Sequence, residues 1–112
     1  MTIDEFRRMA LSLPEATEQS HMNHPDFRVR GKIFATLGHP TEGWGMVKLT
    51  PQQQQLVVQI EPNVFAPVKG GWGAKGATNV HIRAAKKTSV REVMRDAWRN
   101  VAPKSLLHLA DD

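Results

Sequence analysis

The sequence predicts an α+β fold in which an antiparallel sheet of about four to five strands packs against N- and C-terminal helices. Apolar residues recur at helical spacing near both ends of the chain. Between them, several segments alternate apolar and polar residues, as half-buried strands do. Glycine or proline separates most of these segments, which favours short turns between antiparallel neighbours. A chain of 112 residues supports one modest core, so we expect a single domain over residues 1–112.

The first helix is expected directly after the first residues. Thr2 and Glu5 fit a capping box, in which both side chains satisfy free backbone N–H groups at a helix start. Pro14 ends this helix because it cannot continue the hydrogen-bond ladder. Its apolar stripe consists of Ile3, Phe6, Met9, Ala10 and Leu13.

The stretch from Glu15 to Pro25 is polar and lacks helical periodicity. It contains His21 and His24, whose side chains would point to opposite faces of a single strand. Neither a cysteine nor a second histidine pair is present to complete a tetrahedral set, so no metal site is predicted. We expect an edge strand or a loop with solvent-facing histidines.

Three strands are expected next, at 27–30, 33–37 and 44–49. Gly31-Lys32 separates the first two, and glycine at the first loop position favours a type II′ hairpin. Alternation assigns one side chain in two to the core. Together with the last strand, the residues expected to point inward are Val29, Ile33, Ala35, Leu37, Val47, Leu49, Val80 and Ile82.

A second helix is expected after the third strand. Thr50 is a good N-cap, Pro51 suits the first helical position, and Gln53 completes a capping box. The side chains expected on its buried side are Leu56, Val57 and Ile60.

The chain then returns as a strand and closes with its clearest amphipathic helix. The strand is expected to run through Val80, Ile82 and Ala84, and Ser89 with Glu92 fits a capping box. Pro103 ends the helix. The apolar stripe consists of Val90, Val93, Met94, Ala97, Trp98 and Val101, and Leu106, Leu107 and Leu109 are expected to pack back as a last turn.

A glycine-rich stretch before this last strand has the spacing G-x-G-x-x-G. Gly71, Gly73 and Gly76 form the pattern, which in dinucleotide-binding folds follows a buried strand and opens a helix. Here Pro67 precedes the glycines and strand alternation follows them. The pattern is therefore interpreted as a turn in which Trp72 anchors a loop that leads into the last strand.

Positive charge is concentrated in the middle of the chain. The net charge is +4, yet residues 27–104 hold thirteen Lys or Arg against four acidic residues. Such an asymmetry favours an anionic partner, although a solvated basic surface remains an alternative. Alternation would place five basic side chains together on the uncovered face of the sheet: Arg28, Arg30, Lys48, His81 and Arg83. Lysines of the flanking loops would extend this face: Lys32, Lys69, Lys75, Lys86 and Lys87.

Two tryptophans lie near this expected basic face. Trp44 and Trp72 either stack on a nucleic-acid base at its rim or fill the edge of the core.

Catalysis finds little support in the sequence. The chain has no cysteine and no G-x-S-x-G motif, and no carboxylate pair marks a cleft. The best acid–base candidates are His21, His24 and His81, and their spacing links them to no nucleophile. We therefore expect neither an enzyme nor a cofactor. A pocket that holds one of these histidines beside a carboxylate would instead indicate an enzyme.

The cellular setting expected from the sequence is the cytoplasm. Disulfides are excluded by the absence of cysteine, the N-terminus has no apolar signal region, and no apolar run is long enough for a membrane span.

Short segments along most of the chain resemble the MmcQ/YjbR-like family of small bacterial proteins. They are 11–16, 27–37, 47–49, 65–67, 71–73, 97–98 and 102–104, together with Gly76, Thr78, Val80 and Ile82. The resemblance implies a frataxin-like α+β fold and DNA binding by a double-wing arrangement of strand hairpins, and it supplies no catalytic residues. Frataxin-type iron handling depends on an acidic first helix, and this chain has only Asp4 and Glu5 there.

The function expected from the sequence is a small non-enzymatic module that binds DNA or another polyanion, mainly through phosphate contacts. Oligomeric state is open, with a monomer favoured and no membrane partner. A protein-interaction or small-anion-binding module is the alternative. The residues expected to contact nucleic acid are Arg28, Arg30, Lys32, Lys48, Lys69, Trp72, Lys75, Arg83, Lys86 and Lys87.

Overall fold

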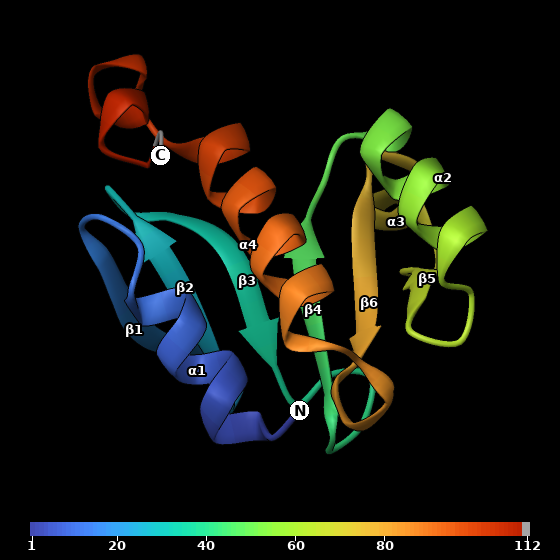
Figure 1. The fold of residues 1–112 in the computed structure, drawn as a ribbon. Coiled ribbons are helices and arrows are strands. Elements are labelled where there is room, and N and C mark those ends of the chain that lie inside the picture. Colours follow the sequence, from blue (N-terminus) through green and yellow to red (C-terminus); the bar gives the residue numbers. More distant parts are fainter. Residues whose placement is uncertain (111–112) are drawn as a thin grey trace.

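A six-stranded antiparallel sheet forms the centre of the computed structural model, which describes residues 1–110 (Figure 1). Its strands lie in the order β1-β2-β3-β4-β6-β5. They are β1 (Ala16–His21), β2 (His24–Val29), β3 (Lys32–Leu37), β4 (Trp44–Lys48), β5 (Phe65–Pro67) and β6 (Ala77–His81). The predicted α+β fold is confirmed. The sheet is larger than expected because the polar segment after the first helix pairs with β2 as an edge strand, and β5 adds a short strand at the other edge.

Helices from both ends of the chain cover one face of this sheet (Figure 1). The helical segments are α1 (Ile3–Leu11), α2 (Pro51–Ile60), α3 (Gly71–Ala74) and α4 (Lys87–Val101), with 3₁₀ turns η1 (Ile82–Ala84) and η2 (Lys104–Ala110). No helix within residues 1–110 is long and apolar enough to cross a membrane.

The apolar stripe of α4 forms the middle of the core. Its predicted members Val90, Val93, Met94, Ala97 and Trp98 are buried. Trp98 is fully buried against the sheet, and its indole Nε1 donates a hydrogen bond to the Pro14 carbonyl at 2.9 Å. This bond joins α4 to the end of α1, where the chain turns into β1.

Two of the three predicted capping boxes are present. Thr2 with Glu5 caps α1, and Thr50 with Gln53 caps α2. The predicted box at Ser89 is wrong, because the N-cap of α4 is Lys86, three residues earlier, and it makes no side-chain hydrogen bond. The start is shifted because β6 ends at His81 and η1 brings the chain into α4 sooner than a strand through Ala84 would.

The hairpin between β2 and β3 differs from the prediction in its turn. The two loop residues are Arg30 and Gly31, both with positive φ (50° and 81°), as a type I′ turn requires. Arg30 therefore lies in the turn and not on the sheet. A β-bulge near the start of β3 also turns Phe34 into the core and leaves Ile33 only half-buried, against the predicted alternation.

The buried side of α2 is polar at its centre. Leu56 and Ile60, expected in the core, are 57% and 65% exposed, whereas Gln54 is buried. The Gln54 amide donates to the carbonyls of Gly73 and Ala77, at 3.0 and 2.9 Å. The helix is rotated toward these carbonyls because their hydrogen bonds would otherwise be lost in the protein interior.

Candidate functional site

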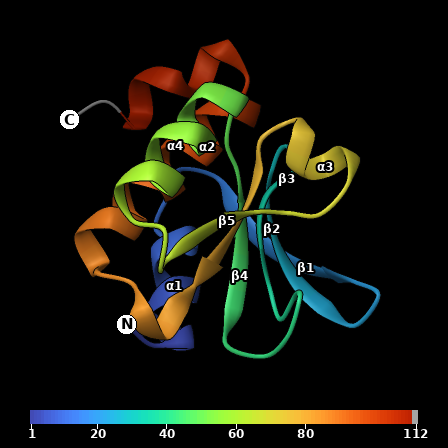
Figure 2. The same cartoon turned by 90° about the vertical axis from the view of Figure 1, so that its right-hand side faces the viewer.

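The face of the sheet opposite α1 and α4, here called the open face, is concave. In Figure 2, helices α1, α2 and α4 lie on one side of the sheet, while α3 and the β1–β2 hairpin project on the other. Val47 and Val80 are fully buried in the core. Their neighbours along the strands, including Met46 and Lys48, therefore face the open side.

Residues 68–76, here called the α3 arm, extend over this open face. One close backbone contact within the arm fixes its shape, and another joins it to Leu49 after β4. An added Cβ at Gly73 would lie 1.6 Å from the Val68 carbonyl oxygen, and one at Gly76 would lie 2.0 Å from that of Leu49. Only glycine fits at these two positions. The glycine pattern therefore serves packing, and α3 is a single turn of helix followed by a strand, not the long helix of a dinucleotide site.

The first of two clefts beside the α3 arm lies on the open face, between this arm and the β1–β2 hairpin. It has a volume of about 360 Å³. Two large apolar side chains stand exposed at its edge, Met22 at 86% and Trp72 at 52%. We call it the histidine cleft, and its lining residues are His21, Met22, His24, Thr36, His39, Met46, Val68 and Trp72.

The second cleft, with a volume of about 310 Å³, lies on the other side of Trp72 at the end of β4, where Asn100 and Val101 of α4 also line it. Lys48 and Lys75 line it, so we call it the lysine cleft. The Lys48 ammonium lies 5.5 Å from the centroid of the Trp72 ring, within the range of a cation–π contact. Trp72 thus separates an apolar, histidine-lined cleft from a cationic one.

A fully buried carboxylate lies beside the histidine cleft. Asp26 receives hydrogen bonds from Arg28 Nε at 2.8 Å and Arg28 Nη2 at 3.0 Å, and its Oδ2 lies 2.7 Å from His21 Nδ1. The Arg28 hydrogen bonds hold the pKa of Asp26 below its ordinary value, against the effect of burial. Asp26 is therefore a carboxylate at neutral pH, and it neutralises Arg28.

We predict that Asp26→Asn lowers the free energy of unfolding at neutral pH by about 1.5–3 kcal/mol, because charge-assisted hydrogen bonds become weaker ones. Since the folded-state pKa of Asp26 lies below its ordinary 3.8, its stabilising contribution is present above that pH and is lost as pH falls through the folded value. Denaturant titrations of the unmodified protein and Asp26→Asn across the acid range should show the difference between their free energies of unfolding becoming smaller as the pH falls. Glu15→Gln, at an exposed ion pair, is the control and should change little.

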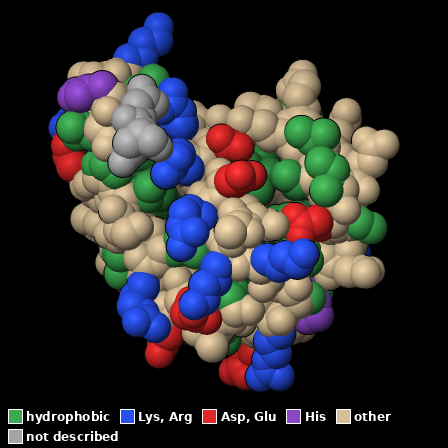
Figure 3. Space-filling view, viewed as in Figure 1, with side chains coloured by type: hydrophobic (Ala, Val, Ile, Leu, Met, Phe, Trp, Pro, Cys, Tyr) green, Lys and Arg blue, Asp and Glu red, His purple; other side chains and the backbone are tan. Residues whose placement is uncertain are grey.

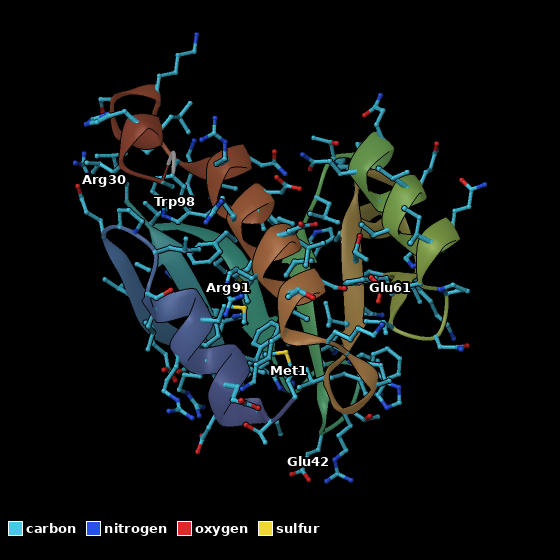
Figure 4. All side chains as sticks on the ribbon, in the orientation of Figure 1. Met1, Arg30, Glu42, Glu61, Arg91 and Trp98 are labelled. Atoms are coloured by element: carbon cyan, nitrogen blue, oxygen red, sulfur yellow. The ribbon has the colours of Figure 1, made fainter. Side chains whose placement is uncertain are left out.

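The predicted basic patch is not assembled. Arg28 is paired with Asp26, and Arg30 lies in a turn, where it pairs with Glu15 at 2.7 and 3.1 Å. Figure 4 shows Arg30 at an outer corner of the molecule. Arg83 is in η1 instead of a strand because β6 is shorter than expected.

The remaining predicted contact residues divide between two regions. The structure brings Lys48, Trp72 and Lys75 together at the lysine cleft, and Lys69 is exposed on the α3 arm. Lys87 pairs instead with Glu5 of α1 on the helical side, Lys86 precedes it, and Lys32 is exposed at the start of β3. Of the two rim tryptophans, Trp44 is stacked on His81 with ring centroids 4.6 Å apart, and Trp72 is the accessible one.

The sequence interpretation missed a basic stripe on the helical face. Lys and Arg side chains are spread over that face in Figure 3. Arg91 lies between α4 and α1 in Figure 4, and shallow depressions around it are lined by Arg8, Lys87 and Arg95 together with Glu5 and Glu92. Lys87, Arg91 and Arg95 are four residues apart, a spacing that places side chains on one face of a helix and could have predicted this stripe.

The histidines of the cleft share one face, which the sequence interpretation also missed. Met22 and Asn23 form a turn with positive φ (50° and 66°), so His21 and His24 are cross-strand partners and not members of one strand. Opposed residues in a hairpin point to the same side. The expected edge strand is confirmed, but its histidines line a cleft.

Comparisons with known proteins place this geometry in a family. A protein-family model described as YjbR matches residues 11–100. The structure is similar to the crystal structure of Deinococcus radiodurans protein DR2400, described with the family-model domain DUF419. The TM-score is 0.77 at 17% sequence identity, covering 97% of this chain and 87% of that one. At this identity the likeness shows the fold alone. A comparison with curated proteins gives no match.

Proposed function

The chain belongs to the YjbR family, and from the geometry of its open face we propose that it is a binding module for single-stranded nucleic acid. The observation that carries the proposal is Trp72. Its side chain is 52% exposed, although the α3 arm that holds it is fixed by contacts of Gly73 and Gly76 with backbone. A large apolar side chain held in place in solvent offers contact area at a low cost in conformational entropy.

The surroundings of Trp72 fit the two parts of a nucleotide. A base stacked on the indole would lie over the apolar histidine cleft, and Lys48 and Lys75 would meet the adjacent phosphates in the lysine cleft. Only unpaired bases offer a free face for such stacking, which favours a single strand over a duplex. Lys69 on the α3 arm extends the cationic side.

This proposal keeps part of the surface expected from the sequence. Lys48, Lys69, Trp72 and Lys75 remain in it. Arg28 and Arg30 are left out because carboxylates occupy their guanidinium groups. Arg83, Lys86 and Lys87 are left out because they lie in η1 and at the start of α4, and Lys32 because it lines neither cleft.

We expect Trp72→Ala to weaken binding of a labelled single-stranded oligonucleotide by roughly 5- to 150-fold. This range corresponds to the roughly 1–3 kcal/mol that a stacked base contributes. Fluorescence anisotropy titration measures the loss. Affinity of the unmodified protein should also fall with rising salt, because lysine–phosphate contacts release counterions.

Trp44→Ala is the matched control for this experiment. It removes the same side chain from a position that lines neither cleft and is stacked on His81. Its affinity should equal that of the unmodified protein, with thermal unfolding run on both variants to verify folding. An equal loss in the two variants, or no loss in Trp72→Ala, would contradict the proposal.

A second candidate is a protein-interaction module that uses the same face. Met22 and Trp72 stand exposed at the edge of a cleft whose other lining includes Met46 and Val68, a setting that fits an apolar anchor side chain of a partner. The lysines beside it favour an acidic partner. Competition decides between the candidates: a partner protein that oligonucleotides fail to displace would favour this one.

A further inference from the structure

The histidine cleft has a feature that binding alone does not require. His21, which lines it, is held through Nδ1 by the buried carboxylate of Asp26 at 2.7 Å. An ionised carboxylate only accepts hydrogen bonds, so the proton of this bond belongs to His21 Nδ1. In neutral His21 the other ring nitrogen, Nε2, then carries a lone pair. A histidine oriented in this way by a carboxylate is the arrangement of a general base.

Two more imidazoles lie beside His21. His24 is its cross-strand partner, and the ring of His24 lies 6.0 Å from that of His39 in the loop after β3. All three histidines line the histidine cleft. In the strand order β1-β2-β3, His24 lies between His21 of β1 and His39 of the loop after β3, and we call this order the row.

We propose that this row cleaves RNA by internal transesterification, an inference that rests on the proposed single-strand binding. A phosphodiester next to a base stacked on Trp72 would lie over His24. RNA carries its own nucleophile, the 2′-hydroxyl, which suits a cleft whose lining has only one hydroxyl side chain, that of Thr36. The substrate class is therefore single-stranded RNA, and single-stranded DNA is bound without reaction.

The step balances without another reactant. His21 Nε2 takes the proton of the 2′-hydroxyl, the O2′–P bond forms, and the P–O5′ bond breaks. Attacking and leaving oxygens lie in line at phosphorus, so the general acid belongs at the other end of the row. His39 as imidazolium gives its proton to O5′, and protonated His24 stabilises the charge that develops on the phosphoryl oxygens. The products are a 2′,3′-cyclic phosphate and a 5′-hydroxyl end.

The test uses three oligonucleotides of one sequence: RNA, 2′-O-methyl RNA and DNA. Each is labelled at the 5′ end and incubated with the full chain, and binding is measured in parallel by anisotropy. We expect all three to bind and RNA alone to be cleaved, with cyclic phosphate ends identified by mass spectrometry. His21→Ala should cleave RNA at least about 100-fold more slowly when rates are compared with all of the RNA bound, since general acid–base groups contribute 10²–10⁴-fold.

His81→Ala, purified in the same way, is the control for contaminating nuclease and for histidine loss in general, because His81 lies under Trp44 and lines neither cleft. Its RNA cleavage should be unchanged, and that of His39→Ala should fall. Binding of all three oligonucleotides with RNA left intact, or equal cleavage by His21→Ala, overturns the inference while the proposed function stands. Absence of binding overturns both.

Discussion

Gly73→Ala is expected to destabilise the protein and to abolish oligonucleotide binding together. The new Cβ would lie 1.6 Å from the Val68 carbonyl oxygen and 2.7 Å from its carbon, both backbone atoms that no rotamer change can move. Overpacking that flexible side chains absorb costs about 1–3 kcal/mol, and we expect more here. The α3 arm must then change its own shape, which disturbs its hydrogen bonds to Gln54 and Ala77, and Trp72 loses its fixed position. Thermal unfolding and anisotropy titration measure the two effects.

Gly71→Ala is the matched control, since it lies in the same short helix. A Cβ at Gly71 meets nothing within 4 Å, and its φ is not in the left-handed region. We expect a change in stability within about 0.5 kcal/mol and unchanged binding. Similar losses in both variants would show that glycine flexibility, and not the close approach of two backbones, governs the arm.

The predictable parts of the fold are those whose signal is local. Helix caps at Thr2 and Thr50 and the apolar stripe of α4 follow from residues three or four apart, and the structure confirms them. The type of the turn at Arg30 and Gly31 could not be predicted from such local signals. Glycine fits the second position of a type I′ turn as well as the first position of a type II′ turn, so the sequence around Gly31 admits both.

Charge pairing was the main reason for the wrong basic patch. Asp26 and Arg28 are two residues apart on one strand, so alternation places both on the same face, and their ion pair was within reach of the sequence. The pairing of Arg30 with Glu15 could not be predicted from the sequence, because it depends on the register in which β1 pairs with β2. Counting cations without their partners overstated the positive charge of the open face.

The two clefts depend on contacts between distant parts of the chain. His21 and Trp72 come from the β1–β2 hairpin and the α3 arm, and both line the histidine cleft although β3, β4 and β6 lie between these elements in the sheet. Neither periodicity nor spacing in a single sequence predicts that residues so far apart in the chain line one cleft. The glycine pattern did mark the arm, although its role in close packing appears only once Val68 and Leu49 are placed beside it.

Trp98→Ala should cause the largest loss of stability of any single side-chain truncation, about 3–5 kcal/mol, because it leaves a cavity at the centre of the core. It also leaves the Pro14 carbonyl without its indole donor at the junction of α1 and β1. For a domain of this size we expect the Tm to fall by more than about 10 °C. Differential scanning calorimetry and denaturant titration measure both quantities.

Trp98→Phe separates the two causes. It keeps an aromatic ring in the core and removes only the hydrogen bond to Pro14 and part of the volume, so its loss should be clearly smaller than that of Trp98→Ala. The β1–β2 hairpin, which carries His21, begins two residues after Pro14. If the hydrogen bond governs this junction, Trp98→Phe should speed amide exchange in β1 more than in β4. Equal losses of stability in the two variants would instead assign the contribution of Trp98 to what Phe lacks, the indole N–H and the volume of the second ring.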